Sequence, residues 1–281
     1  MQTNRPAQHR YCHDEWVRWL RSSLVPAPGQ RTLIEQQRTP TPRGVICSLA
    51  TGRHRELLAE SAPTLAAYGQ RHGWDVLLSS ESPQGARPPS WAKVVLVRDL
   101  LSRYPFVFWV DADALIVDLA PDLLDAARVG DDAADIWFAR HPQERDPDAT
   151  VLNAGVFLAR SALFTDALLE AMWNAEEFID HNWWENAALL NLLGYSLQPP
   201  FEQHTVTPWN ARIGSLDLAW NSVPGYCESP APVVNHHARS DHDDFGLRLA
   251  SMAADRVATE ARFPKDFAGL RPRRQWRARR S

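Results

Sequence analysis

The sequence predicts an α/β protein: a single Rossmann-like domain with a mostly parallel central sheet flanked by helices. Two observations lead to this class. From residue 44 to residue 118, apolar segments of strand length alternate with segments of helical periodicity, in the order β-α-β-α-β that is typical of a doubly wound nucleotide-binding half. Residues 106–110, FVFWV, form an uninterrupted run of aromatic and β-branched residues, which indicates a strand buried on both faces.

Local signals place the elements of the first half. The segment 44–49, GVICSL, is an apolar strand that ends in the turn Ala-Thr-Gly. Helical periodicity then runs to residue 72, and Ser61 followed by Pro63 predicts a new helix start inside that segment. A second strand at 74–79 and a helix at 91–103 precede the apolar run.

The second half continues the alternation with less regular spacing. We expect strands at 135–140, 152–159 and 233–234, and helices at 162–179 and 183–193, the last ended by Gly194. The polar segment 141–150, HPQERDPDAT, is the least core-like part of this half and predicts a loop.

The chain divides into three parts. Residues 1–43 read as an N-terminal extension and linker, with one amphipathic helix at 14–24 followed by four prolines. Residues 44–270 form the predicted domain. Residues 271–281 carry six arginines and no acid, and we expect a solvated basic tail, with weak contact to an anionic membrane surface as the alternative.

Composition excludes several classes of protein. The 281 residues are 44% hydrophobic and 23% charged, as in ordinary globular proteins, and the net charge of −4 argues against nucleic-acid binding. The three cysteines have neither metal-ligand spacing nor the pattern of a disulfide framework. Because we find no signal-peptide core and no apolar stretch of transmembrane length, we expect a cytoplasmic protein without a transmembrane segment. The sequence carries no signal for an oligomeric state.

An acidic pair, Asp111 and Asp113, follows the apolar run directly. If the strand continues through both residues, their side chains lie on one side of it, at the carboxyl edge where open α/β sheets bind ligands. Two carboxylates suit Mg²⁺ or Mn²⁺, and His236, after the apolar pair at 233–234, is the candidate third ligand. The alternatives are a solvated acidic strand end and a structural histidine. No dinucleotide fingerprint or P-loop is present.

A second group of candidates lies at the start of the helix at 183–193. Glu185 and Asn186 follow Trp183 and Trp184, where polar groups can point into a cleft. An acid at this position also stabilises a helix N-terminus, which is the alternative for Glu185. The two tryptophans are either core residues or a stacking surface for a sugar.

These segments together resemble a known family. The segments PSWAKVVLVRDLLSRYPFVFWVDADALI, LNAGVFLARSALF, WWENAALL and VVNHHA, in this order, are similar to the galactosyl transferase GMA12/MNN10 family, also called glycosyltransferase family 34. The family includes fungal Golgi α-mannosyl and α-galactosyl transferases and plant xyloglucan xylosyltransferases. The resemblance implies a GT-A fold, a sugar-nucleotide donor, dependence on Mn²⁺ (or Mg²⁺), and retention of the α configuration.

The resemblance also implies roles for individual residues. Asp111, Asp113 and His236 match the metal ligands, and Glu185 with Asn186 match the acidic residue and glutamine at the reacting centre. Trp183 and Trp184 are the expected acceptor contacts. The expected donor contacts are Leu49, Ala50, Thr51, Lys93, Asp111, Ala112, Asn153, Ala154, Gly155 and Arg239.

The chain departs from the family pattern in four places. Asn186 replaces Gln, and His237 and Arg239 replace the Phe and Gly after the metal histidine. Asp241 stands where a phosphate-binding lysine is expected, and Arg239 is the candidate to supply the positive charge instead.

The predicted function is therefore transfer of a hexose or pentose from a UDP- or GDP-sugar to a hydroxyl of a small molecule, lipid or glycan. Two alternatives stay open. A haloacid-dehalogenase-like phosphatase also has an apolar strand that ends in Asp-x-Asp. The second alternative, a sugar-nucleotide-binding protein that keeps the fold but has no turnover, is suggested by the altered segment after His236.

Overall fold

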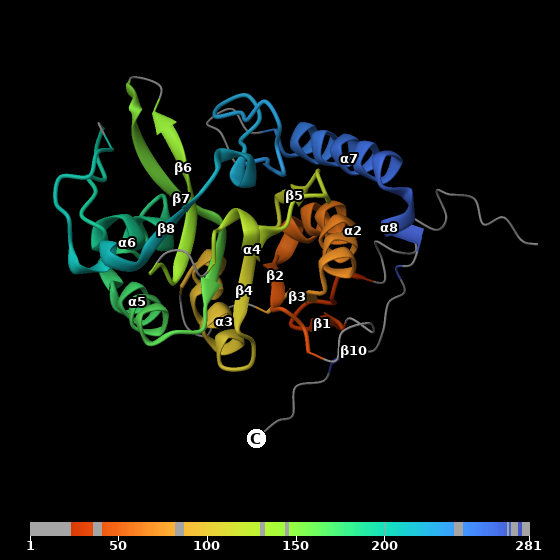
Figure 1. Ribbon diagram of the computed structural model, residues 1–281, viewed down its shortest axis with the longest axis horizontal. Helices are drawn as coiled ribbons and strands as arrows, with labels where there is room; N and C mark the ends of the chain where they lie inside the picture. Colours follow the sequence, from red (N-terminus) through yellow and green to blue (C-terminus); the bar gives the residue numbers. More distant parts are fainter. Residues whose placement is uncertain are drawn as a thin grey trace, which may run out of the picture.

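An eight-stranded sheet with helices on both faces forms the centre of the computed structural model (Figure 1). The structure describes residues 24–35, 41–81, 87–129, 133–143, 146–199, 201–238, 244–268, 270 and 275–276. The strand order is β10-β1-β3-β2-β4-β7-β6-β8. The strands are β1 (Arg31–Ile34), β2 (Val45–Leu49), β3 (Asp75–Ser79), β4 (Phe106–Val110), β6 (Ile136–Gln143), β7 (Asp146–Arg160), β8 (Ile213–Leu216) and β10 (Gln275–Trp276).

The sheet combines a parallel centre with antiparallel additions. Strands β3, β2 and β4 are parallel, as are β6 and β8, whereas β7 lies antiparallel to both β4 and β6. The predicted α/β class is confirmed. A separate two-stranded sheet of β5 (Ala114–Ile116) and β9 (Val234–His236) begins just beyond the carboxyl end of β4.

Helices cover the two faces of the sheet in different sets. The helices are α2 (Arg55–His72), α3 (Ala92–Leu101), α4 (Leu123–Ala126), α5 (Leu163–Asn174), α6 (Trp184–Leu192), α7 (Phe245–Arg262) and α8 (Pro264–Ala268), with 3-10 turns η1 (Gly52–His54), η2 (Pro89–Trp91), η3 (Glu176–Phe178), η4 (Pro208–Arg212) and η5 (Leu218–Asn221). Ile46 and Phe108 pack on the face covered by α2, while Val45 and Val107 pack on the face of α3, α5 and α6. Helix α7 lies outside α2 and beside β5 (Figure 1).

Helix α2 runs without interruption through Pro63, so the predicted helix start at Ser61 was wrong. The Ser61 hydroxyl donates to the Leu58 carbonyl, and the Thr64 hydroxyl donates to the Ser61 carbonyl, so both side chains bind inside the helix. Proline in a helix interior costs about 3 kcal/mol. Burial of nearly every residue from Leu57 to Gly69 outweighs that cost.

Two segments expected to be irregular are strands. The stretch between Pro26 and Pro42 contains β1, which pairs with β3 and alternates half-buried with buried side chains. Within the expected loop at 141–150, the described residues 141–143 belong to β6 and 146–150 to β7, and these strands pair antiparallel with register shifts near Phe138 and Pro142. In both cases pairing with a neighbouring strand satisfies backbone groups that a polar sequence would otherwise leave to water.

The predicted three-part division of the chain stays a prediction. Strands β1 and β10 lie outside residues 44–270 and yet join the main sheet. The expected helix at 14–24 lies outside the described residues except for its last residue, Leu24, which is buried. Among the helices that the structure describes, none combines the length and the apolar character needed to cross a membrane.

Candidate functional site

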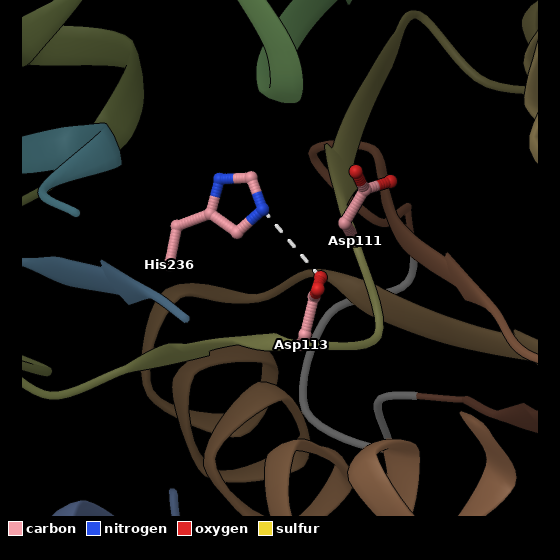
Figure 2. A group of neighbouring side chains, drawn as sticks. All are labelled: Asp111, Asp113 and His236. Carbon is pink, nitrogen blue, oxygen red and sulfur yellow. Dashed lines mark ion pairs between the residues drawn. The ribbon is translucent and has the colours of Figure 1, made fainter. Parts of the chain in front are cut away.

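The acidic pair lies in a tight turn between β4 and β5. Strand β4 ends at Val110, and the turn closes where the Ala114 N–H donates to the Asp111 carbonyl at 2.9 Å. The expectation that Asp111 and Asp113 continue the strand was therefore wrong: pairing with β7 ends at Val110, and the chain then turns toward β9. The turn still directs both carboxylates into one space, as Figure 2 shows.

The structure brings the three predicted metal ligands together. Ala114 pairs with His236 across the β5–β9 ladder, so the imidazole comes to the end of β4 from a distant part of the chain. One ligand atom from each of Asp111, Asp113 and His236 lies within 4.8 Å of the others, and His236 Nε2 lies 3.5 Å from Asp113 Oδ1. Two carboxylates and an imidazole are an acceptable donor set for Mn²⁺ or Mg²⁺.

Two asparagines fix which nitrogen of His236 faces the acidic pair. The Gly155 N–H donates to Asn153 Oδ1 at 2.8 Å, so this oxygen is the atom that accepts from Asn221 Nδ2 at 3.2 Å. Asn221 Oδ1 consequently faces His236 Nδ1 at 2.9 Å, and Nδ1 is the protonated nitrogen. Nε2 is therefore the nitrogen that faces Asp113, and it is the nitrogen that would meet a cation shared with the two carboxylates.

Lys93, from α3, contacts Asp111 and is only 5% exposed. Its Nζ lies 3.0 Å from Asp111 Oδ1 and 2.8 Å from Glu185 Oε1, and it donates to the Ala154 carbonyl at 3.0 Å. Burial alone would lower the pKa of Lys93, but the charges of Asp111 and Glu185 outweigh burial and raise it. Lys93, one of two lysines in the sequence, is therefore a permanent cation that joins β4, β7 and α6.

The two aspartates have opposite electrostatic environments. Burial raises the pKa of Asp111, and Lys93 offsets part of that rise. Burial would also raise the pKa of Asp113, but His236 and Arg248 overcome it and hold the pKa below its usual range. Arg248 comes from α7, and its Nη1 lies 3.1 Å from Asp113 Oδ2. Asp113 thus lies between His236 at Oδ1 and Arg248 at Oδ2, whereas both oxygens of Asp111 lie within 3.3 Å of Lys93 Nζ.

Glu185 and Asn186 occupy the first turn of α6 and face β7. Glu185 is 4% exposed, and its Oε2 has no hydrogen-bond partner among the described residues, while Oε1 contacts Lys93. Asn186 Oδ1 accepts from the Ala154 N–H at 2.9 Å. The simple role of a solvated acid at a helix N-terminus does not fit Glu185, because its carboxylate is buried.

The two predicted acceptor residues differ in environment. Trp183 is half-buried and packs on Phe201, with ring centroids 4.8 Å apart, and on His181 at 5.7 Å. Trp184 is 39% exposed and has a φ of 45°, a left-handed conformation that is rare for a bulky residue. Such outliers gather at functional sites. Trp184 is therefore the better placed of the two to meet a ligand.

The remaining predicted donor contacts lie around the same edge. Strand β2 ends at Leu49, and Ala50 and Thr51 follow it. The Ala50 N–H donates to the Ser79 carbonyl and the Ala50 side chain is buried, whereas the Leu49 and Thr51 side chains are half-buried. Ala112 lies between the two aspartates. Arg239 lies outside the described residues.

His237, which replaces the phenylalanine of the family pattern, has its side chain paired with α7 rather than with the carboxylates of Asp111 and Asp113. The His237 N–H donates to the Asp113 carbonyl at 2.8 Å, and its Nε2 lies 3.0 Å from Asp255 Oδ2 on α7. His237 therefore joins the acidic turn to α7.

Sequence reasoning missed two residues of this site. Asn221 lies in an irregular segment, AWNSV, that carries no periodicity. Arg248 lies in the first turn of α7, and the pattern of charged residues in this helix is typical of a solvent-exposed face. A signal for either would have required knowing that η5 and α7 lie beside the β4–β5 turn.

The fold of this chain is the GT-A fold of glycosyltransferases, as the resemblance implies. It aligns with the crystal structure of a glycosyltransferase involved in glycosylation of the major capsid of PBCV-1, with a TM-score of 0.54 and 11% identity, over 75% of this chain and 98% of that one. It also aligns with the apo form of the glycosyltransferase GlyE of Streptococcus pneumoniae, with a TM-score of 0.51 and 14% identity, over 81% of this chain and 64% of that one.

The sequence comparisons agree with the predicted resemblance. Residues 47–129 match the galactosyl transferase GMA12/MNN10 family. An uncharacterized alpha-1,2-galactosyltransferase of Schizosaccharomyces pombe is 28% identical over 195 residues, covering 56% of this chain and 51% of that protein. A probable glycosyltransferase 7 of Oryza sativa is 29% identical over 163 residues, covering 56% of this chain and 34% of that protein. The chain thus spans about half or less of these relatives.

Proposed function

We propose that this chain is a metal-dependent glycosyltransferase that moves a hexose or pentose from a UDP- or GDP-sugar to an acceptor hydroxyl, with retention of configuration. The observation that carries the proposal is the cluster of Asp111, Asp113 and His236 beyond the carboxyl end of β4, on a GT-A fold. This is the edge where such sheets bind nucleotides.

Mn²⁺ or Mg²⁺ is the proposed cofactor, held by the two carboxylates and by Nε2 of His236. When bound, such an ion neutralises the charge that develops on a departing diphosphate. Asn221 and Asn153 support this role because they hold Nδ1 of His236 in a hydrogen bond, so that Nε2 is the nitrogen toward the two carboxylates. The ion pair with Lys93 holds the Asp111 carboxylate in position.

Glu185 is the proposed carboxylate at the reacting carbon. Lys93 binds Oε1, so Oε2, which is buried and has no partner among the described residues, is the oxygen proposed for substrate, either facing the cationic sugar carbon or aligning the acceptor hydroxyl. Asn186, whose Oδ1 is bound to β7, has its amide nitrogen left for a sugar hydroxyl. Retention and same-face attack rest on the family resemblance.

The acceptor is a small molecule, lipid or glycan that stacks on Trp184 and Trp183. Exposed tryptophan beside a buried carboxylate suits a sugar ring, whose apolar face packs on an indole. Because the S. pombe relative is named as an alpha-1,2-galactosyltransferase, a galactosyl donor is the first to test.

The test is a thermal-shift screen of UDP-, GDP- and dTDP-sugars with and without Mn²⁺, followed by measurement of nucleoside diphosphate release. Binding raises the apparent melting temperature. Asp113→Ala should abolish release and keep the fold, while Asp180→Ala, at an exposed aspartate, should change neither. Near wild-type turnover in Asp113→Ala would show that the metal assignment is wrong.

The two alternatives predict different results in the same assay. A phosphatase releases phosphate from a generic aryl phosphate and is inhibited by fluoroaluminate. A binding protein without turnover is stabilised by the nucleotide but releases no product in the presence of donor.

A further inference from the structure

The first residue of α7, Phe245, holds two arginine side chains around its ring. The guanidinium carbon of Arg53, from η1, lies 3.7 Å from the ring centroid, and that of Arg248 lies 5.5 Å from it. The His54 ring meets the same phenyl ring edge-on at 6.1 Å. Residues from two distant segments thus gather cations on one aromatic side chain.

The Phe245 ring is fixed by apolar packing. It lies against a buried cluster of Leu57 on α2, Leu115 on β5 and Met252 on α7. Leu115 is two residues beyond Asp113, so the phenyl ring packs against β5, the strand that follows the acidic turn. Cation–π contact then orients both guanidinium groups relative to that turn.

The two arginines differ in charge compensation. Arg248 is largely buried and pairs with Asp113. Arg53 is exposed, and no carboxylate among the described residues pairs with it. Arg53 follows Thr51 and Gly52 at the carboxyl end of β2, which is the parallel neighbour of β4. An exposed cation that no described carboxylate compensates therefore lies at the edge of the sheet where the donor is proposed to bind.

We infer that Arg53 and Arg248 form a two-arginine seat for the diphosphate of the nucleotide donor, an inference that rests on the proposed function. A diphosphate carries several negative charges, and guanidinium groups bind phosphate oxygens through paired N–H donors. The Asp113–Arg248 contact joins the seat to the metal cluster, so one diphosphate reaches both. The seat supplies the positive charge that the missing phosphate-binding lysine would have given.

Isothermal titration with the full chain and Mn²⁺ tests the seat. UDP, GDP, uridine and guanosine are titrated into wild type, Arg53→Gln and Arg248→Gln. The Kd of the diphosphate should rise about tenfold in each variant, the loss of one charge-assisted hydrogen bond, while the Kd of the nucleoside stays unchanged. Arg53→Gln is the decisive variant, because the residue is exposed and its replacement leaves the core intact.

Arg262→Gln is the matched control. Arg262 lies on the same helix, stacks on Phe263 at 4.9 Å and pairs with Asp118 at 2.9 Å, yet it belongs to the far end of α7. It should bind every titrant like wild type. Arg53→Lys should recover part of the lost diphosphate affinity, since it restores the charge without the planar fork.

The outcomes separate the seat from the proposed function. If wild type binds UDP or GDP and Arg53→Gln binds it equally well, the seat is overturned and the glycosyltransferase proposal stands. Equal losses for diphosphate and nucleoside also overturn the seat, because they show a general change in the site. If wild type binds neither UDP nor GDP with Mn²⁺, both proposals fail.

Discussion

Gly155 and His236 lie in such close contact that no side chain fits between them. A Cβ on Gly155 would lie 2.2 Å from Cε1 and 2.8 Å from Nδ1 of His236. The Gly155 carbonyl accepts from the Asp111 N–H at 2.8 Å, so the same residue also holds the start of the acidic turn. The strand β7 therefore sets the distance between the imidazole and the two carboxylates.

Gly155→Ala should displace His236 and separate the three metal ligands. We expect Mn²⁺ affinity to fall by at least about tenfold, in line with substitutions that disturb ligand orientation, and donor turnover to fall with it. Electron paramagnetic resonance of free Mn²⁺ measures the affinity without requiring activity.

Gly214→Ala is the matched control for this substitution. A Cβ there would lie 2.1 Å from the Trp137 ring in β6, a clash of the same size outside the site. It should lower stability and leave Mn²⁺ affinity unchanged. Equal Mn²⁺ affinities in the two variants would contradict a positioning role for Gly155.

Asn221→Ala should weaken Mn²⁺ binding by about 10–100-fold, the range for residues that orient a ligating histidine. The substitution removes the acceptor that keeps the proton on Nδ1 of His236, so the ring is free to rotate or change tautomer. Mn²⁺ titration is again the measurement. Asn210 lies in η4, and its Oδ1 accepts from the N–H of Thr207, the N-cap of that turn, so Asn210→Ala controls for the loss of a structural asparagine. A lower melting temperature with normal Mn²⁺ affinity would assign Asn221 a structural role alone.

Lys93→Met should destabilise the fold by about 3–5 kcal/mol, because it leaves the buried Glu185 carboxylate and the partly buried Asp111 carboxylate without this counter-charge. Urea unfolding at pH 7 gives the difference in the free energy of unfolding. Lys265→Met, at the exposed second lysine, should change it by about 0.5 kcal/mol or less. Similar midpoints for the two variants would mean that Lys93 is not the compensating charge.

Glu185→Gln should lower turnover by about 10²–10³-fold, the cost of losing one preorganised electrostatic contact at a reacting centre. The amide keeps the size of the side chain, and none of the proposed metal ligands is changed, so Mn²⁺ and nucleotide affinities should persist. Steady-state kinetics with a sugar nucleotide, beside Mn²⁺ titration, separates the two effects. Turnover that survives in this variant removes Glu185 from the chemistry.

The carboxyl ends of the apolar segments in the sequence were enough to predict that Asp111, Asp113 and His236 belong to one site. Asp111 and Asp113 were predicted to lie at the carboxyl edge because the run before them is apolar, and His236 because an apolar pair precedes it. Their detailed geometry was not predictable, since the turn after Val110 depends on pairing of β5 with a strand about 120 residues away in the chain. Asn221 and Arg248 act through that same tertiary arrangement.

The fold shows the same division between local and tertiary signals. Strands β2 and β4 have continuous apolar runs and were predicted within a residue or two. Strand β1 has only four residues between prolines, and its alternation became meaningful once β3 offered a partner. The helix through Pro63 is a case in which burial overrides a local stop signal.

Asp135 should make folding stability depend on pH at the β6–β8 edge. Its carboxylate is 1% exposed and lies between Arg160, which donates to Oδ1 at 2.8 Å, and Arg212. Burial would raise the pKa of Asp135, but the two guanidinium groups outweigh it and lower the pKa. A lowered folded-state pKa gives stability that is present above the unfolded value of about 3.9 and is lost as pH falls through the folded value.

Asp135→Asn should therefore be less stable than wild type at pH 7, by about 1.5–3 kcal/mol, the range for hydrogen bonds to charged groups. The difference should shrink below about pH 4, where the wild-type carboxylate also becomes protonated. Urea unfolding at several pH values measures it. Asp166→Asn, in an exposed pair with Arg98, should differ from wild type by less than about 1 kcal/mol throughout, because solvent screens that pair. A difference for Asp135→Asn that stays constant from pH 7 to pH 3 would show that lost packing, rather than the ionised carboxylate, is responsible.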